Sequence, residues 1–272
     1  MSISKNSKFL VLGGNGFIGS NLVKFLRRGG NLVDNIDIKD NRKQDLRKIK
    51  LGNLNSYSGC FFLAWDVGGS KYLSDKKYWN AQYQNNFSLI SNVLPQLEHS
   101  KIPFLFVSSQ LAGTDLSPYS LTKFAAEQYC RNIRNATIAR QWNAYGSIEA
   151  HDLRSHVVSD LITQALENHE IKLKTSGLEQ RQFVHMEDIC RAYVKMISIG
   201  NGSIFDVSSK HYTTILQLAE LISELTGTRV IPGKQKGNDP KVSEIDWCPE
   251  WKPTITLKEG LRSTIDSFIS GQ

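Results

Sequence analysis

The chain has 272 residues, a net charge of +7 and a pI near 9.1. Its basic residues are scattered along the sequence, which indicates a solvated basic surface and no nucleic-acid partner. The four cysteines are far apart and the histidines lack ligand spacing, so neither a disulfide framework nor a metal site is expected. No apolar run approaches the ~20 residues of a membrane span, and we expect a cytoplasmic protein without membrane contact.

A buried strand, a glycine-rich turn and a helix are predicted near the start of the chain. Residues 9–12 are apolar, and Gly13, Gly16 and Gly19 follow at the spacing G-x-x-G-x-x-G. The pyrophosphate of a dinucleotide needs close backbone N–H groups and the positive end of a helix dipole, which glycine permits. Apolar residues then recur at helical spacing up to Gly29. We therefore expect the turn to bind a dinucleotide through Gly13, Asn15, Gly16, Phe17, Ile18 and Gly19.

The second predicted strand, residues 31–38, carries Asp37 near its end, 18 residues after Gly19. A carboxylate at this position accepts hydrogen bonds from a ribose diol and repels a 2′-phosphate, so NAD is favoured over NADP. Lys39 and Arg42 lie close by and would weaken that repulsion. The alternative interpretation of Asp37 is a solvated acid at the end of a strand.

A tyrosine and a lysine share one face of a helix that is predicted further along. Ser117 is suited to the N-cap, and Tyr119 and Lys123 follow four residues apart. A neighbouring ammonium and the positive ring of an oxidised nicotinamide favour the phenolate, which can then take a proton from a sugar hydroxyl. Ser109, at the end of a predicted strand, would hydrogen-bond the reacting oxygen. The alternative is a chance pair of surface side chains.

Several segments resemble the extended short-chain dehydrogenase/reductase family, which contains nucleotide-sugar epimerases and dehydratases. They are Gly13–Ser20, Asp45-Leu46-Arg47, Phe62-Leu63-Ala64, Asn86, Arg140–Gly146 and Gln180–Asp188. The resemblance implies a nucleotide-diphosphate sugar as substrate, and cofactor contacts at Asp45, Leu46, Leu63, Ala64, Trp65, Asn86, Ser108, Tyr119 and Lys123. It also implies substrate contacts at Ser109, Gln110, Asn143 and Arg181.

Two of these residues have suitable chemistry without the resemblance. Arg181 is a planar donor able to hold a phosphate through two parallel hydrogen bonds, and Asn143 can donate and accept near a sugar or phosphate. The alternatives are an ordinary surface arginine and an asparagine that stabilises a loop.

Three departures from the family pattern bear on the reaction. Trp65 stands where a small residue is usual, so it either reshapes the substrate pocket or is a core aromatic. Ser109 and Tyr119 are only ten positions apart, which leaves little of the loop that normally packs beside the sugar. Gln110 and Leu111 follow the strand where family 4,6-dehydratases carry an acid pair, so dehydration is disfavoured. The leading interpretation is an NAD-dependent epimerase acting at C4; the alternatives are an NAD(P)H-dependent 4-keto-6-deoxy nucleotide-sugar reductase and a non-catalytic cofactor-binding protein.

Predicted strands and helices alternate up to Gly146, as a doubly wound parallel sheet of the Rossmann type requires. Helices are predicted at residues 157–166 and 213–222, and a strand at 204–207 is expected to return to the main sheet. We expect two domains. Residues 1–146 and about 181–210 are predicted to form an NAD-binding domain. Residues about 147–180 and 211–272 are predicted to form a small discontinuous C-terminal cap that binds substrate.

Two further expectations concern contacts with other molecules. Residues 232–240, rich in glycine, lysine and asparagine, are predicted to form a flap over the nucleotide. The family resemblance implies a homodimer that forms through the helices expected at residues 83–97 and 119–133.

Overall fold

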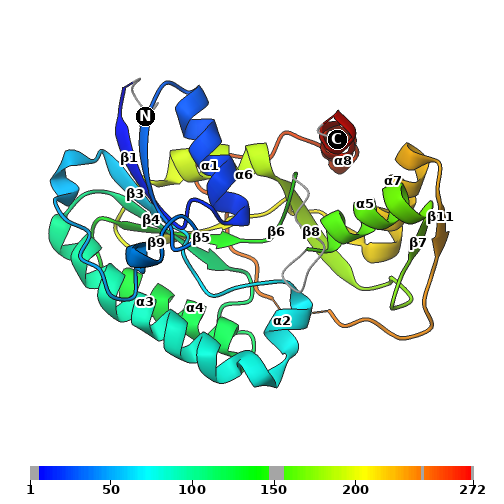
Figure 1. The fold of residues 1–272 in the computed structure, drawn as a ribbon, viewed down its shortest axis with the longest axis horizontal. Coiled ribbons are helices and arrows are strands. Elements are labelled where there is room, and N and C mark those ends of the chain that lie inside the picture. Colours follow the sequence, from blue (N-terminus) through cyan, green and yellow to red (C-terminus); the bar gives the residue numbers. More distant parts are fainter. Residues whose placement is uncertain (1–5, 147–155, 240–241, 271–272) are drawn as a thin grey trace.

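A parallel sheet of six strands forms the centre of the protein in the computed structural model, which describes residues 6–146, 156–239 and 242–270. The strand order is β2-β1-β3-β4-β5-β9, and every neighbouring pair is parallel (Figure 1). The doubly wound α/β fold predicted from the sequence is therefore confirmed. The strands are β1 (Lys8–Leu12), β2 (Leu32–Ile36), β3 (Gly59–Phe62), β4 (Phe104–Ser109), β5 (Ala136–Gln141) and β9 (Ser203–Val207).

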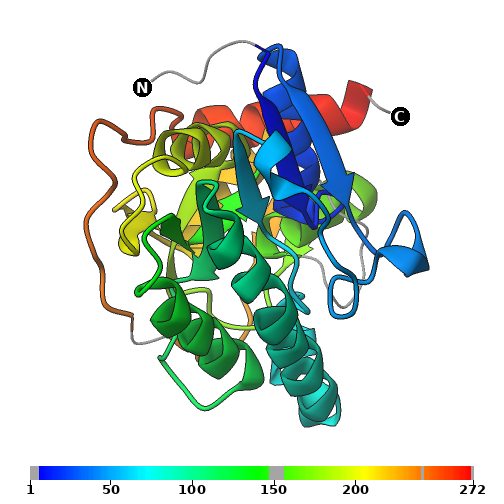
Figure 2. The same cartoon turned by 90° about the vertical axis from the view of Figure 1, so that its left-hand side faces the viewer.

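Helices cover both faces of this sheet, as Figures 1 and 2 show. The helices α1 (Phe17–Arg28) and α6 (Met186–Met196) pack together on one face. The helices α3 (Trp79–Ser100) and α4 (Pro118–Cys130) pack together on the other. Shorter elements precede α3, namely the helix α2 (Ser70–Ser74) and the 3-10 turns η1 (Arg42–Gln44), η2 (Leu54–Ser56) and η3 (Lys76–Tyr78).

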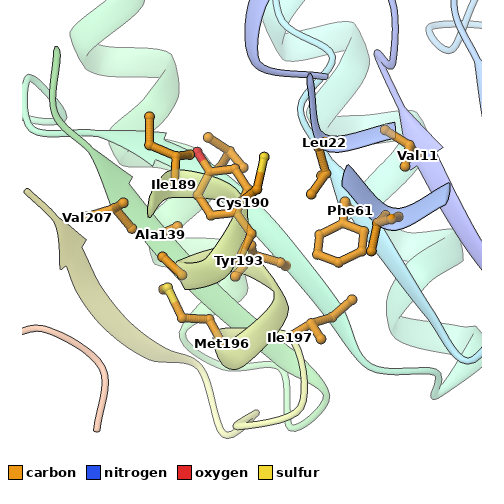
Figure 3. Packing of buried hydrophobic residues seen from close by; sticks show 14 of the residues in the cluster. Val11, Leu22, Phe61, Ala139, Ile189, Cys190, Tyr193, Met196, Ile197 and Val207 are labelled. Atoms are coloured by element: carbon orange, nitrogen blue, oxygen red, sulfur yellow. The ribbon is translucent and has the colours of Figure 1, made fainter. Parts of the chain in front are cut away.

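Two hydrophobic cores follow from the alternation of side chains along the strands. Successive residues of a strand point to opposite faces, so Val11 belongs to the core under α1 and α6, while Leu10 belongs to the core under α3 and α4. Both faces are buried, which explains why the strands are apolar almost without interruption. Figure 3 shows the first core, in which Leu22 of α1 and Tyr193 of α6 lie beside Phe61 of β3.

A smaller second part lies beyond the carboxyl ends of the central strands (Figure 1). It has a third hydrophobic core that includes Ile162, Leu218 and Leu261. Its strands form a three-stranded sheet of order β10-β8-β6 and a parallel pair β11-β7. The elements are β6 (Asn143–Tyr145), α5 (Val157–Asn168), β7 (Glu170–Lys172), β8 (Gln180–His185), β10 (Tyr212–Thr214), α7 (Ile215–Thr226), β11 (Arg229–Ile231) and α8 (Leu257–Ser270).

The elements expected in the C-terminal half are present, with boundaries shifted by up to four residues. The helix predicted at 157–166 is α5, and the strand predicted at 204–207 is β9, which pairs with β5. The helix predicted from residue 213 begins two residues later, because Thr214 is its N-cap in a reciprocal capping box with Gln217. The expected division into two domains remains a prediction.

All four cysteines are buried free thiols. Among the described residues, no helix combines the length and the apolar character that crossing a bilayer needs. The same residues contain no group of three or more His, Cys, Asp and Glu side chains that could hold a metal ion.

Candidate active site

The glycine turn joins β1 to α1, and its glycines serve two different purposes. Gly13 has a φ of +89°, and a Cβ there would lie 2.6 Å from the backbone nitrogen of Ala64. A Cβ on Gly19 would lie 2.2 Å from the carbonyl oxygen of Gly13. The fold itself therefore requires these two glycines, because side chains would collide with backbone atoms.

Gly16 is different, because the fold does not exclude a side chain there. Its φ is −76°, and a Cβ would approach only the Gly13 carbonyl oxygen, at 3.3 Å. Among the described residues, no side chain caps the helix that begins at Phe17. The first turn of α1 therefore keeps uncapped N–H groups beside a backbone without a Cβ, which is what a pyrophosphate needs. The turn fits the dinucleotide that the sequence predicts.

Asp37 is held against this turn by backbone donors. Its side chain is buried, at 7% exposure, so the alternative of a solvated acid is wrong. Oδ2 accepts a hydrogen bond from the N–H of Asn15 at 2.8 Å, and Oδ1 accepts one from the N–H of Lys39 at 2.8 Å. Each carboxylate oxygen retains a further lone pair for a ribose hydroxyl. The Lys39 ammonium donates to the Asn15 carbonyl oxygen at 3.1 Å, so a cation also lies here, as expected. We call Asp37, Ala64 and residues 13–19 the cofactor edge.

The other residues predicted to contact the adenine side belong to a hydrogen-bonded network. Both carboxylate oxygens of Asp45 pair with Arg47, at 2.7 and 2.9 Å, and this pairing lowers the pKa of Asp45. Leu46 is buried in the core under α3 and α4. The amide of Asn86 accepts from the N–H of Asp66 at 2.8 Å and donates to its carbonyl oxygen at 3.2 Å, which fixes the loop after β3.

Tyr119 and Ser109 meet as the sequence predicts. Ser117 caps α4, its Oγ accepting from the N–H of Ser120 at 3.3 Å, and the helix carries Tyr119 towards the end of β4. Burial raises the pKa of Tyr119, and the neighbouring Ser109 side chain opposes the rise. The phenol and the Ser109 hydroxyl are therefore neighbours at the end of β4.

Lys123 is also buried, but its ammonium has other neighbours. Nζ donates to the carbonyl oxygen of Val107 at 2.6 Å and lies 3.9 Å from the centre of the Trp65 ring. Burial lowers the pKa of Lys123 well below its ordinary value, and the charge of Glu127 opposes that change. The expected effect of the ammonium on the phenol stays a prediction.

Trp65 combines the two interpretations left open by the sequence. Its ring packs against Phe62 and Phe106 of the core, with ring centroids 6.2 and 5.5 Å away. The same ring covers Lys123, in a contact that is worth roughly 2 kcal/mol when it is shielded from water. The indole Nε1 is buried and has no hydrogen-bond partner among the described residues, which costs about 1–3 kcal/mol. Leu63 and Ala64, just before Trp65, are held by hydrogen bonds to the carbonyl oxygen of Leu12.

Glu127 is a residue that the sequence reasoning missed. It is fully buried one helical turn after Lys123 and accepts hydrogen bonds from Ser108 Oγ at 2.7 Å and from Arg140 Nη2 at 2.7 Å. The hydroxyl of Ser108, predicted to contact the cofactor, is thus directed at Glu127. The spacing of Tyr119, Lys123 and Glu127 along one helix face could have revealed this partner.

A cavity of about 210 Å³, which we call the substrate pocket, brings together three of the predicted substrate contacts. They are Gln110, Asn143 and Arg181, and the amide of Asn143 donates to the Gln182 carbonyl oxygen at 3.1 Å. Ser109 lies directly before Gln110, so the pocket adjoins Ser109 and Tyr119. Sequence reasoning missed the remaining lining residues, which are Trp142, Gln180, Tyr212, Asp239 and Val242.

Arg181 is fixed at the wall of this pocket. Its Nη1 donates to the carbonyl oxygen of Gln180 at 2.6 Å, and its Nη2 donates to that of Asn238 at 2.9 Å. Asp239 pairs with Nη1 at 3.4 Å. The expected flap is described up to Asp239, and its last two described residues therefore contact Arg181. Residue 240 lies outside the described residues. The guanidinium keeps further N–H groups for an anionic ligand.

Comparisons with known proteins agree with this geometry. Residues 9–208 match the NAD dependent epimerase/dehydratase family. The chain is 26% identical to GDP-L-fucose synthase 1 of Arabidopsis thaliana, over 97% of this chain and 94% of that protein. It is 29% identical to UDP-glucuronic acid decarboxylase 1 of Danio rerio over 48% of this chain, a match that spans only 33% of that protein.

A solved structure shares the fold along nearly the whole chain. It is UDP-glucose 4-epimerase from Thermotoga maritima with UDP-glucose, at a TM-score of 0.81 and 22% identity, over 97% of this chain and 99% of that chain. At this identity the likeness concerns the fold. Because the family match extends over most of the sequence and agrees with the glycine turn and the Ser–Tyr pair, the chain belongs to the NAD-dependent epimerase/dehydratase family.

Proposed function

We propose that this protein is an NAD-dependent nucleotide-sugar epimerase that acts at C4 of the sugar. The observation that carries the proposal is that Tyr119 and Ser109 are neighbours between the cofactor edge and the substrate pocket. NAD, when bound, supplies a hydride acceptor and donor. Tyr119 takes the proton of the sugar hydroxyl and later returns it, while Ser109 orients the reacting oxygen.

The substrate pocket suits a sugar joined to a diphosphate. Arg181 is held by two backbone carbonyl oxygens, so it can bind a phosphate without first being ordered. Gln110 and Asn143 offer amide groups to the sugar or to its phosphate. UDP-glucose is the ligand named for the similar epimerase of known structure, and it is the first substrate to test.

Asp37 supports NAD rather than NADP as the cofactor. Its carboxylate is fixed beside the glycine turn, where it can accept from ribose hydroxyls and would repel a 2′-phosphate. Lys39 offsets part of that repulsion.

Dehydration is less well supported than epimerisation. Eliminating water needs an acid or base in addition to the tyrosine, and the segment from Ser109 to Tyr119 contains one carboxylate, Asp115. That carboxylate is exposed and accepts a hydrogen bond from the N–H of Ser117 at 2.8 Å, within its own turn. It therefore stabilises the turn that precedes α4.

A single assay separates the epimerase from a reductase, the second candidate, which the short segment before Tyr119 favours. UDP-glucose carrying deuterium at C4 is incubated with the protein and NAD, and the products are followed by NMR. We expect UDP-galactose that keeps its deuterium, with no net change in NADH. Consumption of NADH or NADPH with a 4-keto-6-deoxy nucleotide-sugar, and no epimerised product across a panel of nucleotide-sugars, would favour the reductase instead.

We further propose that the protein forms a homodimer through the outer faces of α3 and α4. Phe87 on α3 and Phe124 on α4 are 46% and 41% exposed, and Leu116 in the loop between β4 and α4 is 78% exposed. Tyr83 donates to the carbonyl oxygen of Leu116 at 3.1 Å, which joins this loop to α3. Apolar side chains gathered like this are typical of interfaces. Light scattering should give the mass of two chains, and Phe87→Glu should give one; a wild-type monomer would refute the proposal.

A further inference from the structure

Trp65 is placed where the two halves of the candidate site meet. The sheet order puts β3 between β1 and β4, so the residues that follow β3 lie between the glycine turn and Ser109. These segments approach closely, because a Cβ on Gly13 would lie only 2.6 Å from the backbone nitrogen of Ala64. Trp65 follows Ala64 directly, and its ring reaches Lys123 on α4. A bulky indole is therefore built into the edge along which a dinucleotide would lie.

The indole limits what the lysine can do. A lysine ammonium has three N–H groups. One of them is used by the Val107 carbonyl oxygen, and the Trp65 ring, at 3.9 Å, occupies a second direction. Phe106 closes the inner side, its ring centre lying 4.9 Å from Nζ. Within the described part of the chain one N–H group is left, and Lys123 is only 4% exposed, so water does not compete freely for it.

We propose that Trp65 is a positioning residue for Lys123, whose indole face holds the ammonium so that one N–H group remains for the reaction. This inference rests on the proposed function, because it assigns Lys123 a part in the same chemistry. Trp65 acts through the lysine by aiming it and by favouring its charged form. Glu127, buried one turn further along α4, favours the charged form from the other side.

Three variants distinguish the effect of the aromatic face of Trp65 from the effect of its size. Trp65→Leu keeps an apolar side chain in place but removes the face, and Trp65→Phe keeps a smaller face. Trp79→Leu is the matched control, because the Trp79 ring also contacts a lysine ammonium. That ammonium belongs to Lys76, on the short turn before α3, and its Nζ lies 5.7 Å from the ring centre. Lys123 is titrated by NMR of lysine labelled at Cε, its resonance identified by its loss in Lys123→Met. This titration needs neither substrate nor cofactor.

The expected results have a definite direction. A cation beside an aromatic face is stabilised, so Trp65→Leu should lower the pKa of Lys123 further. It should also lower kcat about 30-fold with little change in KM, the size expected for the loss of one shielded cation–aromatic contact. Trp65→Phe should recover most of both effects, and Trp79→Leu should cause neither.

Two results would overturn the inference. One is a Trp65→Leu protein whose Lys123 titration and kcat match the wild type; the other is a Trp65→Phe protein as impaired as Trp65→Leu. The proposed function fails separately, if the wild type turns over no nucleotide-sugar while Trp65→Leu still moves the Lys123 titration.

Discussion

The cofactor edge and the substrate pocket are assembled in different ways. Most of the cofactor edge comes from one strand–turn–helix unit, and Gly13 and Gly19 are required there by contacts between backbone atoms. The substrate pocket instead takes side chains from separate elements, from Gln110 after β4 to Val242 near the C-terminal segment. Local backbone geometry thus determines the first region, while tertiary packing determines the second. Substitutions in the two regions should consequently have different effects on cofactor binding, substrate binding and stability.

The largest effect is expected between the two regions, at Tyr119. Tyr119→Phe removes the proton-transfer group but keeps the ring, so turnover should fall by about 10²–10⁴-fold. NAD affinity, measured by calorimetry, should stay close to that of the wild type. Tyr129→Phe, on the same helix with its hydroxyl bonded to Glu98 at 2.9 Å, is the control and should keep its activity. A Tyr119→Phe protein with wild-type turnover would refute the assigned role.

Two alanine substitutions test the cofactor edge. Gly16→Ala adds a methyl group for which the Gly13 carbonyl oxygen, at 3.3 Å, must move only slightly, so it should weaken NAD binding about 10–100-fold with little loss of thermal stability. Gly19→Ala drives a Cβ to 2.2 Å from a carbonyl oxygen and should lower the unfolding temperature as well. Calorimetry and thermal unfolding measure the two effects. If Gly16→Ala binds NAD as the wild type does, the pyrophosphate does not lie against this glycine.

A smaller effect, confined to the substrate, is expected in the pocket. Arg181→Ala removes a charged donor, and hydrogen bonds to charged groups contribute about 1.5–3 kcal/mol, so KM for the nucleotide-sugar should rise about 10–100-fold. NAD affinity should not change, because Arg181 belongs to the other region. Arg134→Ala, at an exposed arginine before β5, is the control. An unchanged KM would show that the substrate phosphate binds elsewhere.

The same contrast explains what the sequence could and could not predict. The glycine turn, Asp37 and the N-cap at Ser117 are local patterns, and the structure has the geometry that each pattern implies. The pocket walls at Tyr212 and Asp239 meet only through the pairing of β10 with β8 and the course of the C-terminal segment. No spacing in the sequence indicates those contacts.

Lys123 shows a subtler limit of prediction. The spacing of four residues places Lys123 on the same helix face as Tyr119, as predicted. Its ammonium, however, contacts the Val107 carbonyl oxygen and the Trp65 ring. The direction of a long side chain depends on its neighbours in space, here an indole from the loop after β3 and a carbonyl group from β4. Helical periodicity places the Cβ atoms but does not place the charge.

The most direct test of the account is the nicotinamide content of the purified protein. The protein is denatured without prior treatment, and the released nicotinamide is quantified together with its oxidation state. An epimerase regenerates its cofactor in each cycle, so we predict near-stoichiometric NAD, mostly oxidised. A protein that carries no nicotinamide and instead consumes NADH or NADPH with keto-sugars would contradict the epimerase assignment.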